Sequence, residues 1–176
     1  PGSGNFRARV RSFAPNVAAV DMYLTAPDAD IANLSPNANA KAGAYGSVGV
    51  LDNYPPGASR IRFTTAGTKT VIYDSGPVTL PGDTNANLVV YSRGSGTLVN
   101  LAMLQTTGAA TATTLESNAA RVRALHLAND TGALNLLANH AVLFPDLGYG
   151  VPADYASVAN ASYEFTAEAV ATPGAV

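Results

Sequence analysis

The sequence predicts an all-β protein made of two tandem antiparallel β-sandwich modules, of which the second is incomplete. Apolar residues alternate with polar residues at a period of two rather than 3.6, which places successive side chains on opposite faces of a strand. The alternating runs are short, and turn-forming Gly, Pro, Asn and Asp residues separate them. Many short strands of this kind are typical of sandwiches. The pattern then restarts near residue 119.

The first half of the chain contains a series of expected strands. In the opening run, arginines alternate with Ala8, Val10 and Ser12, which predicts one wet face and one buried face. In a later run, Ile61 and Phe63 are expected inward, with Arg60 and Arg62 outward. A polar loop is expected at 28–41 and turns at 53–57 and 81–83. The expected strands are 7–13, 17–24, 45–51, 59–65, 70–75, 77–80, 87–92 and 98–105.

Composition and repeats together give the expected domain organisation. We expect a flexible N-terminus at 1–6, a first sandwich at 7–105, a linker of small polar residues at 106–118, and a second, truncated sandwich at 119–176. The four residues ARVR at 8–11 return at 120–123. The first two expected strands are repeated at 121–127 and 133–137. Three later segments of the first copy also have matches in the second: 45–46 at 149–150, 48–52 at 154–158, and 60–63 at 163–166. These matches in order predict an internal repeat.

The second copy is shorter than the first, because no segment of it corresponds to residues 70–105 of the first copy. Three or four strands are therefore expected to be missing. Two explanations stay open. The sequence starts at Pro1 rather than Met, so we expect a processed or recombinant segment that ends before the natural C-terminus. Alternatively, a strand from another chain completes the second sandwich, as in donor-strand complementation.

Charge and cysteine content exclude several function classes. Charged residues are 12% of the 176 residues, and the net charge is −2, so no basic patch for nucleic acid is expected. The absence of Cys excludes disulfides and thiolate metal sites. No apolar run approaches the roughly 18 residues that span a bilayer, so no membrane insertion is expected. Low charge with abundant Ala, Gly, Asn and Thr indicates an exported or surface bacterial protein.

Several segments resemble domain-of-unknown-function family 4397. They are 8–11, 19–23, 120–137 and 143–174, and the resemblance covers most of the chain. It implies immunoglobulin-like β-sandwich modules, in tandem, in an exported bacterial protein. The family's opening strand usually carries His-Ala-Ser-Pro, where this chain has 12–15 (SFAP) and 126–129 (HLAN). Asp21 in the first copy is replaced by Asn135 in the second, so a site that needs both this His and this Asp is intact in neither copy. The family supplies no catalytic residues.

No set of residues points to catalysis, so we expect a protein that is not an enzyme. His126 and His140 are the only histidines, and no G-x-S-x-G nucleophile motif is present. His126 is expected to be a hydrogen-bonded structural residue, and His140 a solvated residue of a hairpin turn. Two histidines without Cys make a zinc site improbable, and we predict neither a metal nor a cofactor.

Three other segments have both a structural and a functional interpretation. The Asp and Asn residues of 28–41 could hold calcium, but their spacing matches no known calcium loop, and Asx turns are favoured. The run 93–97 (RGSGT) is followed by a strand, which favours a hairpin turn over a phosphate loop. Arg7, Arg9 and Arg11, with Arg60 and Arg62 adjacent to them, are favoured as a charged face that opposes aggregation over a site for anionic glycans.

The function predicted from these observations is that of a non-catalytic, extracellular structural or interaction protein. It would be a subunit of a surface filament or assembly in which a neighbouring chain's strand completes the second sandwich. The expected interface edge is Tyr163, Glu164, Phe165 and Thr166. The alternative is a carbohydrate- or ligand-binding adhesion module, with Tyr45 and Tyr149 as the aromatic contacts. The partner is thus a protein or a second copy of the chain, or a glycan.

Overall fold

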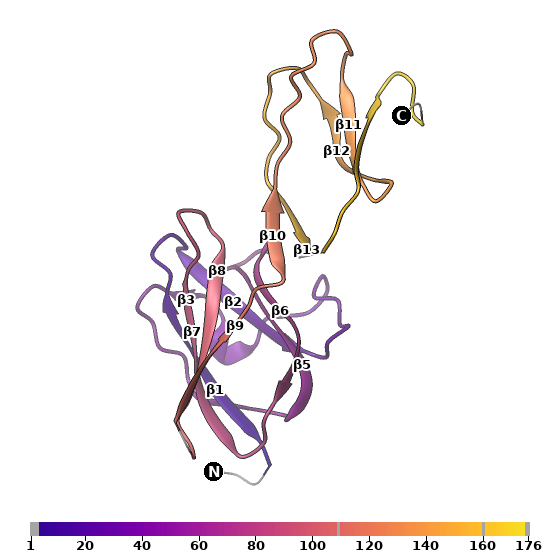
Figure 1. Cartoon of the computed structure of the whole chain (residues 1–176). Helices are drawn as coiled ribbons and strands as arrows, with labels where there is room; N and C mark the ends of the chain where they lie inside the picture. The colour runs from indigo at the N-terminus through magenta and orange to yellow at the C-terminus, as the bar shows by residue number, and fades with distance from the viewer. Residues whose placement is uncertain (1–3, 109, 160, 175–176) are drawn as a thin grey trace. The chain divides into compact units, whose positions relative to one another are not determined.

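The computed structural model describes residues 4–108, 110–159 and 161–174. The chain divides into two compact units, Pro1–Ala119 and Ala120–Val176, which we call the first and second units (Figure 1). Strands make up the regular structure of the described residues, apart from one 3-10 turn, η1 (Ala38–Ala40). The predicted all-β sandwich class is therefore confirmed.

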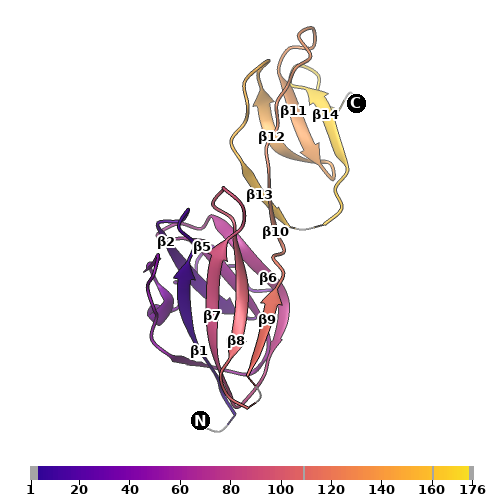
Figure 2. The same cartoon turned by 60° about the vertical axis from the view of Figure 1, so that its left-hand side comes forward.

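The first unit consists of two sheets that enclose one core. The first sheet has the strand order β4-β1-β7-β8-β9, and the second has the order β3-β2-β5-β6. Figure 2 shows β1, β7, β8 and β9 side by side. Large buried side chains from both sheets, such as Phe6, Phe63, Tyr73, Leu88 and Leu101, form the core between them. The strands are β1 (Phe6–Phe13), β2 (Ala19–Thr25), β3 (Gly43–Ala44), β4 (Asp52–Tyr54), β5 (Gly57–Thr65), β6 (Val71–Leu80), β7 (Thr84–Ser92), β8 (Val99–Gln105) and β9 (Thr111–Leu115).

Strand β1 lies inside its sheet, between an antiparallel β4 and a parallel β7. Its alternation is as expected, with Phe6, Ala8, Val10 and Ser12 buried and the intervening arginines half-buried. The other strand pairs of this unit are antiparallel. Because β1 and β7 are parallel, the chain between them must make a long crossover, and it does so through the strands of the second sheet.

Two expected boundaries are wrong. Phe6, expected in a flexible N-terminus at 1–6, is fully buried and begins β1; residues 1–3 lie outside the described residues. The expected linker at 106–118 contains β9, which pairs with β8 from Gln105↔Thr111 to Leu101↔Leu115. Four of the five β9 side chains are exposed, so the strand has no apolar alternation by which the sequence could reveal it.

The expected grouping of the arginines is also wrong. Arg7, Arg9 and Arg11 lie on β1 in the first sheet, whereas Arg60 and Arg62 lie on β5 in the second. Arg62 lies on the outward face of β5, opposite to Ile61 and Phe63, but it is buried there and donates hydrogen bonds to Thr25 Oγ1 and Ala29 O, both at 2.7 Å. These bonds tie the 28–41 loop to the sheet. Ile61 and Phe63 are fully buried, as expected.

The second unit also has two sheets, but with fewer strands. β10 (Ala119–Val122) pairs with β13 (Ala156–Ala159), and β11 (Leu134–Ala138) lies between β12 (Ala141–Leu147) and β14 (Phe165–Ala169). These orders correspond to β1-β4 and β3-β2-β5 of the first unit. Asn139 and His140, both at positive φ, form the tight turn between β11 and β12. This two-residue turn replaces the longer 28–41 loop.

Equivalent hydrogen bonds fix the residue-by-residue correspondence between the units. Gly46 N donates to Ser12 O at 2.7 Å, and Gly150 N donates to His126 O at 2.8 Å. Gly49 N donates to Val10 O in the same way that Ala153 N donates to Ala124 O, at 2.8 and 2.9 Å. Ala66 N donates to Ala19 O, and Val170 N donates to Ala133 O. Thr68 N donates to Thr65 O, and Thr172 N donates to Ala169 O. All four bonds are 3.0 Å long.

This correspondence corrects three of the sequence matches. Val10 corresponds to Ala124, so the two ARVR stretches are out of structural register by two residues. Gly49 and Ala153 make equivalent bonds, so they occupy equivalent positions. The segment 154–158 therefore corresponds to 50–54, and the sequence match to 48–52 is wrong. Val20↔Thr65 and Leu134↔Ala169 are equivalent strand pairs, so Phe165 corresponds to Ile61 rather than to Arg62. A shift of one residue exchanges the two faces of a strand.

Candidate interaction site

The second unit leaves one edge of each of its sheets without a strand. Among the described residues, β10 pairs only with β13, and β14 pairs only with β11. In the first unit, the equivalent edges of β1 and β5 are covered by β7 and β6. The part of the second unit that the structure describes thus has counterparts of β1 to β5 and none of β6 to β9. Unpaired sheet edges offer backbone donors and acceptors to a further strand.

The inward faces of the second unit are correspondingly exposed. Phe165 is 48% exposed, whereas its counterpart Ile61 is 0% exposed. Ala167 is also exposed, although its counterpart Phe63 is fully buried. The buried hydrophobic cluster of this unit consists of Ala124, Phe144 and Leu147. A core of this size supplies little of the burial that a domain needs for independent stability.

A cavity of about 510 Å³ lies on the inward faces of β11 and β14 and of the segment that continues β10. Its walls include Ala124, His126, Leu134, Leu136 and Ala167. Their counterparts in the first unit are Val10, Ser12, Val20, Met22 and Phe63, which are all buried in the core. The cavity therefore occupies the space that core side chains fill in the first unit.

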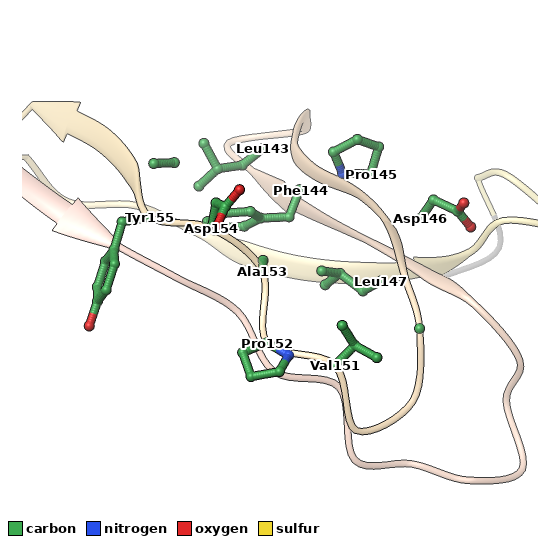
Figure 3. Close-up of a pocket in the computed structure, with 12 residues that line it drawn as sticks. Leu143, Phe144, Pro145, Asp146, Leu147, Val151, Pro152, Ala153, Asp154 and Tyr155 are labelled. Atoms are coloured by element: carbon green, nitrogen blue, oxygen red, sulfur yellow. The ribbon is translucent and has the colours of Figure 1, made fainter. Parts of the chain in front are cut away.

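A second hollow, of about 420 Å³, lies between the end of β12 and the loop that follows it (Figure 3). Leu143, Leu147, Val151 and Ala153 are among its lining residues, and the ring of Tyr155 points away from it (Figure 3). The first unit has an equivalent hollow of about 170 Å³, lined by 39–43 and 47–49 together with Val10.

The two hollows differ at the position of Gly49. A Cβ at Gly49 would lie 3.0 Å from Asn39 O and 3.3 Å from Val10 O, which is tighter than ordinary van der Waals contact. The second unit has Ala153 at the equivalent position.

His126 is buried and hydrogen-bonded, as the sequence predicts. Its Nε2 lies 2.9 Å from Gly132 O, while Ala128 N donates to its Nδ1 at 3.3 Å. Its ring meets Tyr149 edge-on at 6.3 Å between centroids. These contacts hold the loop 127–132 against the continuation of β10. His140 lies in the β11–β12 turn with 81% of its side chain exposed, also as expected.

The exchange of Asp21 for Asn135 changes how the unit is tied together. Asp21 is buried and accepts hydrogen bonds from Ala42 N at 2.6 Å and Gly67 N at 2.8 Å. Asn135 accepts the equivalent bond from Asp146 N at 3.0 Å and donates to Glu168 Oε1 at 3.3 Å. Glu168 Oε2 in turn accepts from Gly174 N. Asn135 thus accepts the counterpart of one Asp21 bond, while Glu168 accepts from a donor that is not the counterpart of Gly67.

The expected interface edge lies only partly on a strand. Phe165 and Thr166 are the first residues of β14, whereas Tyr163 and Glu164 precede it. The rings of Tyr163 and Phe165 lie 5.9 Å apart. Glu164 N donates to Asn139 Oδ1 at 2.8 Å, which anchors the start of the strand. Phe165 lies on the open inward face.

The two expected ligand aromatics occupy equivalent positions, one in each unit. Tyr45 is 60% exposed and Tyr149 is 59% exposed, and each precedes a glycine at positive φ. A further exposed tyrosine, Tyr155, lies beside Arg121 and Arg123. The guanidinium centres lie 5.0 and 5.1 Å from its ring centroid, a cation–π arrangement.

The remaining candidate segments are held by hydrogen bonds within the first unit. Residues 93–97 form the β7–β8 turn, in which Gly94 O and Gly96 O accept hydrogen bonds from Asn16 Nδ2. Lys69 Nζ donates to Ile31 O and Tyr23 OH, which anchors the 28–41 loop. Among the described residues, no group of three His, Cys, Asp or Glu side chains is arranged to hold a metal ion. The same residues contain no helix long and apolar enough to cross a membrane.

The cavity-lining residues Leu134, Leu136 and Ala167 were not predicted as site residues. Their sequence pattern is that of ordinary core residues. In the structure they are more exposed than their counterparts Val20, Met22 and Phe63. Placing 149–150 on 45–46 gives the correct register for the second half of the unit. The matching ARVR letters give a register for β10 that is shifted by two residues.

A scan against family models, a search of curated proteins and a search of solved structures each gave no match to this chain. The resemblance to family 4397 therefore stays a prediction, and the functional argument rests on the geometry of the second unit.

Proposed function

We propose that this chain is a non-catalytic structural or interaction protein of the bacterial cell exterior, built from tandem immunoglobulin-like modules. In this proposal it is a subunit of a surface filament or assembly, and a strand from a neighbouring chain completes the second module. The observation that carries the proposal is the open cavity between two strandless edges, where the first unit has a filled core. Low charge and the absence of a catalytic set are consistent with it.

Strand addition follows from the physical chemistry of such a surface. An open edge presents unpaired backbone groups, and an added strand satisfies them while its alternate side chains enter the cavity. Burying an aliphatic side chain contributes about 1.5–3 kcal/mol. Few other ligands could supply backbone hydrogen bonds and apolar contacts along the same line.

The test is the assembly state of the 176-residue protein, measured by size-exclusion chromatography and electron microscopy. We expect concentration-dependent oligomers or filaments that Phe165→Lys weakens. Leu104→Lys is the matched control, because Leu104 is an exposed apolar residue of the first unit. A monomer at all concentrations, with the second unit as stably folded as the first, would overturn the proposal.

The second candidate function is a carbohydrate- or ligand-binding adhesion module. It is favoured by the equal exposure of Tyr45 and Tyr149 at equivalent positions, since exposed rings stack on sugar faces. A glycan array with the intact protein tests it. Binding that is lost in Tyr45→Ala or Tyr149→Ala would support this function, and an array without any signal would exclude it for the glycans displayed.

A further inference from the structure

The first unit contains a template for the strand that the second unit would accept. β7 runs parallel to β1, in a register from Phe6↔Thr84 to Phe13↔Tyr91. Its alternate residues Thr84, Ala86, Leu88 and Val90 are buried against the facing sheet. Paired residues in adjacent strands point to the same face. The residues opposite Val10 and Ser12 are therefore the ones that fill the core, and they are Leu88 and Val90.

This register transfers to the second unit through the equivalent hydrogen bonds. Val10 and Ser12 correspond to Ala124 and His126, which both line the 510 Å³ cavity. We call residues 119–126 the acceptor segment; it comprises β10 and its continuation. A parallel strand beside it would place its core residues opposite Ala124 and His126, facing Leu134 and Leu136 across the cavity. Ala124 is smaller than Val10, which leaves room for a large aliphatic residue opposite it.

The outward face of the template adds a polar preference. Asn87 Oδ1 accepts hydrogen bonds from Arg9 Nε at 2.8 Å and Arg11 Nε at 2.9 Å. The counterpart of Arg9 is Arg123, whereas the counterpart of Arg11 is Leu125. One of the two arginines is thus retained. The guanidinium of Arg123 lies over the ring of Tyr155, and its N–H groups would be the charged donors for a side-chain carbonyl opposite it. Such hydrogen bonds are stronger than neutral ones.

We propose that the acceptor segment binds a partner strand of β7-like chemistry, in the parallel direction. Aliphatic residues of the partner lie opposite Ala124 and His126, and an asparagine lies opposite Arg123. The inference rests on the proposed function, and it adds the strand's direction, register and side-chain pattern.

The chain itself supplies the probe, which is a labelled peptide of residues 83–93. Titrated against the intact 176-residue protein, it should bind saturably. Substituting Leu88→Asn and Val90→Asn in the peptide should weaken binding at least about tenfold, since two aliphatic side chains lose their burial. Val89→Asn, on the outward face, is the matched control and should bind almost unchanged. These substitutions are in the peptide, so the folding of the protein is unaffected.

Location and direction are tested with the same peptide. Hydrogen exchange should show new protection at 121–125, and a photo-crosslinker at the peptide's N-terminus should react near Ala120 rather than near Ala128. Protection confined to β1, or crosslinks in the antiparallel order, would overturn the inference. An absence of peptide binding would also overturn it. If the protein nevertheless assembles through Phe165, the proposed function stands; if the protein is a stable monomer, both fail.

Discussion

At the scale of single residues, hydrogen-bonded polar side chains hold the loops of the first unit. Asp21 accepts hydrogen bonds from backbone N–H groups of two different loops. Arg62 and Lys69 donate to backbone carbonyls of the 28–41 loop. Each of these side chains joins segments that are distant in sequence, so their loss affects the packing of loops rather than one contact.

Replacing Asp21 by Ala tests this role. The substitution removes a charged acceptor from two N–H groups, and hydrogen bonds to charged groups contribute about 1.5–3 kcal/mol each. We expect the free energy of unfolding of the first unit to fall by about 2–4 kcal/mol, measured by urea denaturation. Asp28→Ala, at an exposed position, is the control. Equal effects of the two substitutions would contradict the role assigned to Asp21.

The ion pair between Arg60 and Asp74 makes the first unit sensitive to acid. Burial alone would raise the pKa of Asp74, but hydrogen bonds from Arg60 and Gly76 N, with the positive charges of Arg60 and Arg62, lower it below its ordinary value. Arg60 donates to both carboxylate oxygens, at 2.8 and 2.5 Å. Because the pKa is lower in the folded state, the resulting stability is present above about pH 4 and is lost as pH falls through the folded-state pKa.

Asp74→Asn should therefore reduce the stability of the first unit near pH 6 and make its loss in acid shallower. Urea midpoints measured between pH 2 and pH 6 for both proteins test this, with Asp28→Asn as the exposed control. Parallel pH profiles for the original protein and Asp74→Asn would show that the ion pair does not set the acid sensitivity.

At the scale of elements, β9 illustrates what the sequence could not reveal. Period-two patterning located most of the strands of the first unit, because each buries one face. β9 is an edge strand with exposed Thr and Ala side chains, and its stability comes from backbone pairing with β8. Leu115 is its contact with the core, and Leu115 O accepts a hydrogen bond from Tyr73 OH at 3.1 Å.

Leu115→Asp tests whether β9 belongs to the folded unit. In a linker the substitution would be neutral, whereas here it places a charge against the core. We expect a loss of about 1–3 kcal/mol in the free energy of unfolding of the first unit. Ala112→Asp, at an exposed position of the same strand, should change it by less than about 0.5 kcal/mol. Equal effects would support the linker interpretation.

The residue-by-residue register between the two units was the other feature that the sequence did not predict correctly. Letters alone matched the two ARVR stretches, but backbone hydrogen bonds are made by every residue type and leave no signature in the letters. Tyr45-Gly46 and Tyr149-Gly150 matched correctly because a glycine at positive φ is required at that turn. The inward direction of Phe165 followed only from strand pairing.

At the scale of the whole molecule, the two units differ in how much core they have. The part of the second unit that the structure describes has counterparts of β1 to β5 and none of β6 to β9 in either sheet. Large side chains fill the core of the first unit, whereas the equivalent space in the second is a cavity. The central claim is that the second unit is an open acceptor whose stability depends on an added strand.

Native-state hydrogen exchange on the dilute, monomeric 176-residue protein tests this claim most directly. The account predicts that amides of β11 and β14 exchange at least about a hundredfold faster than those of β5 and β7, because the open unit unfolds locally at a lower free energy. Addition of the 83–93 peptide should slow exchange in the second unit. Equal protection of the two units in the monomer, without any added strand, would contradict the account.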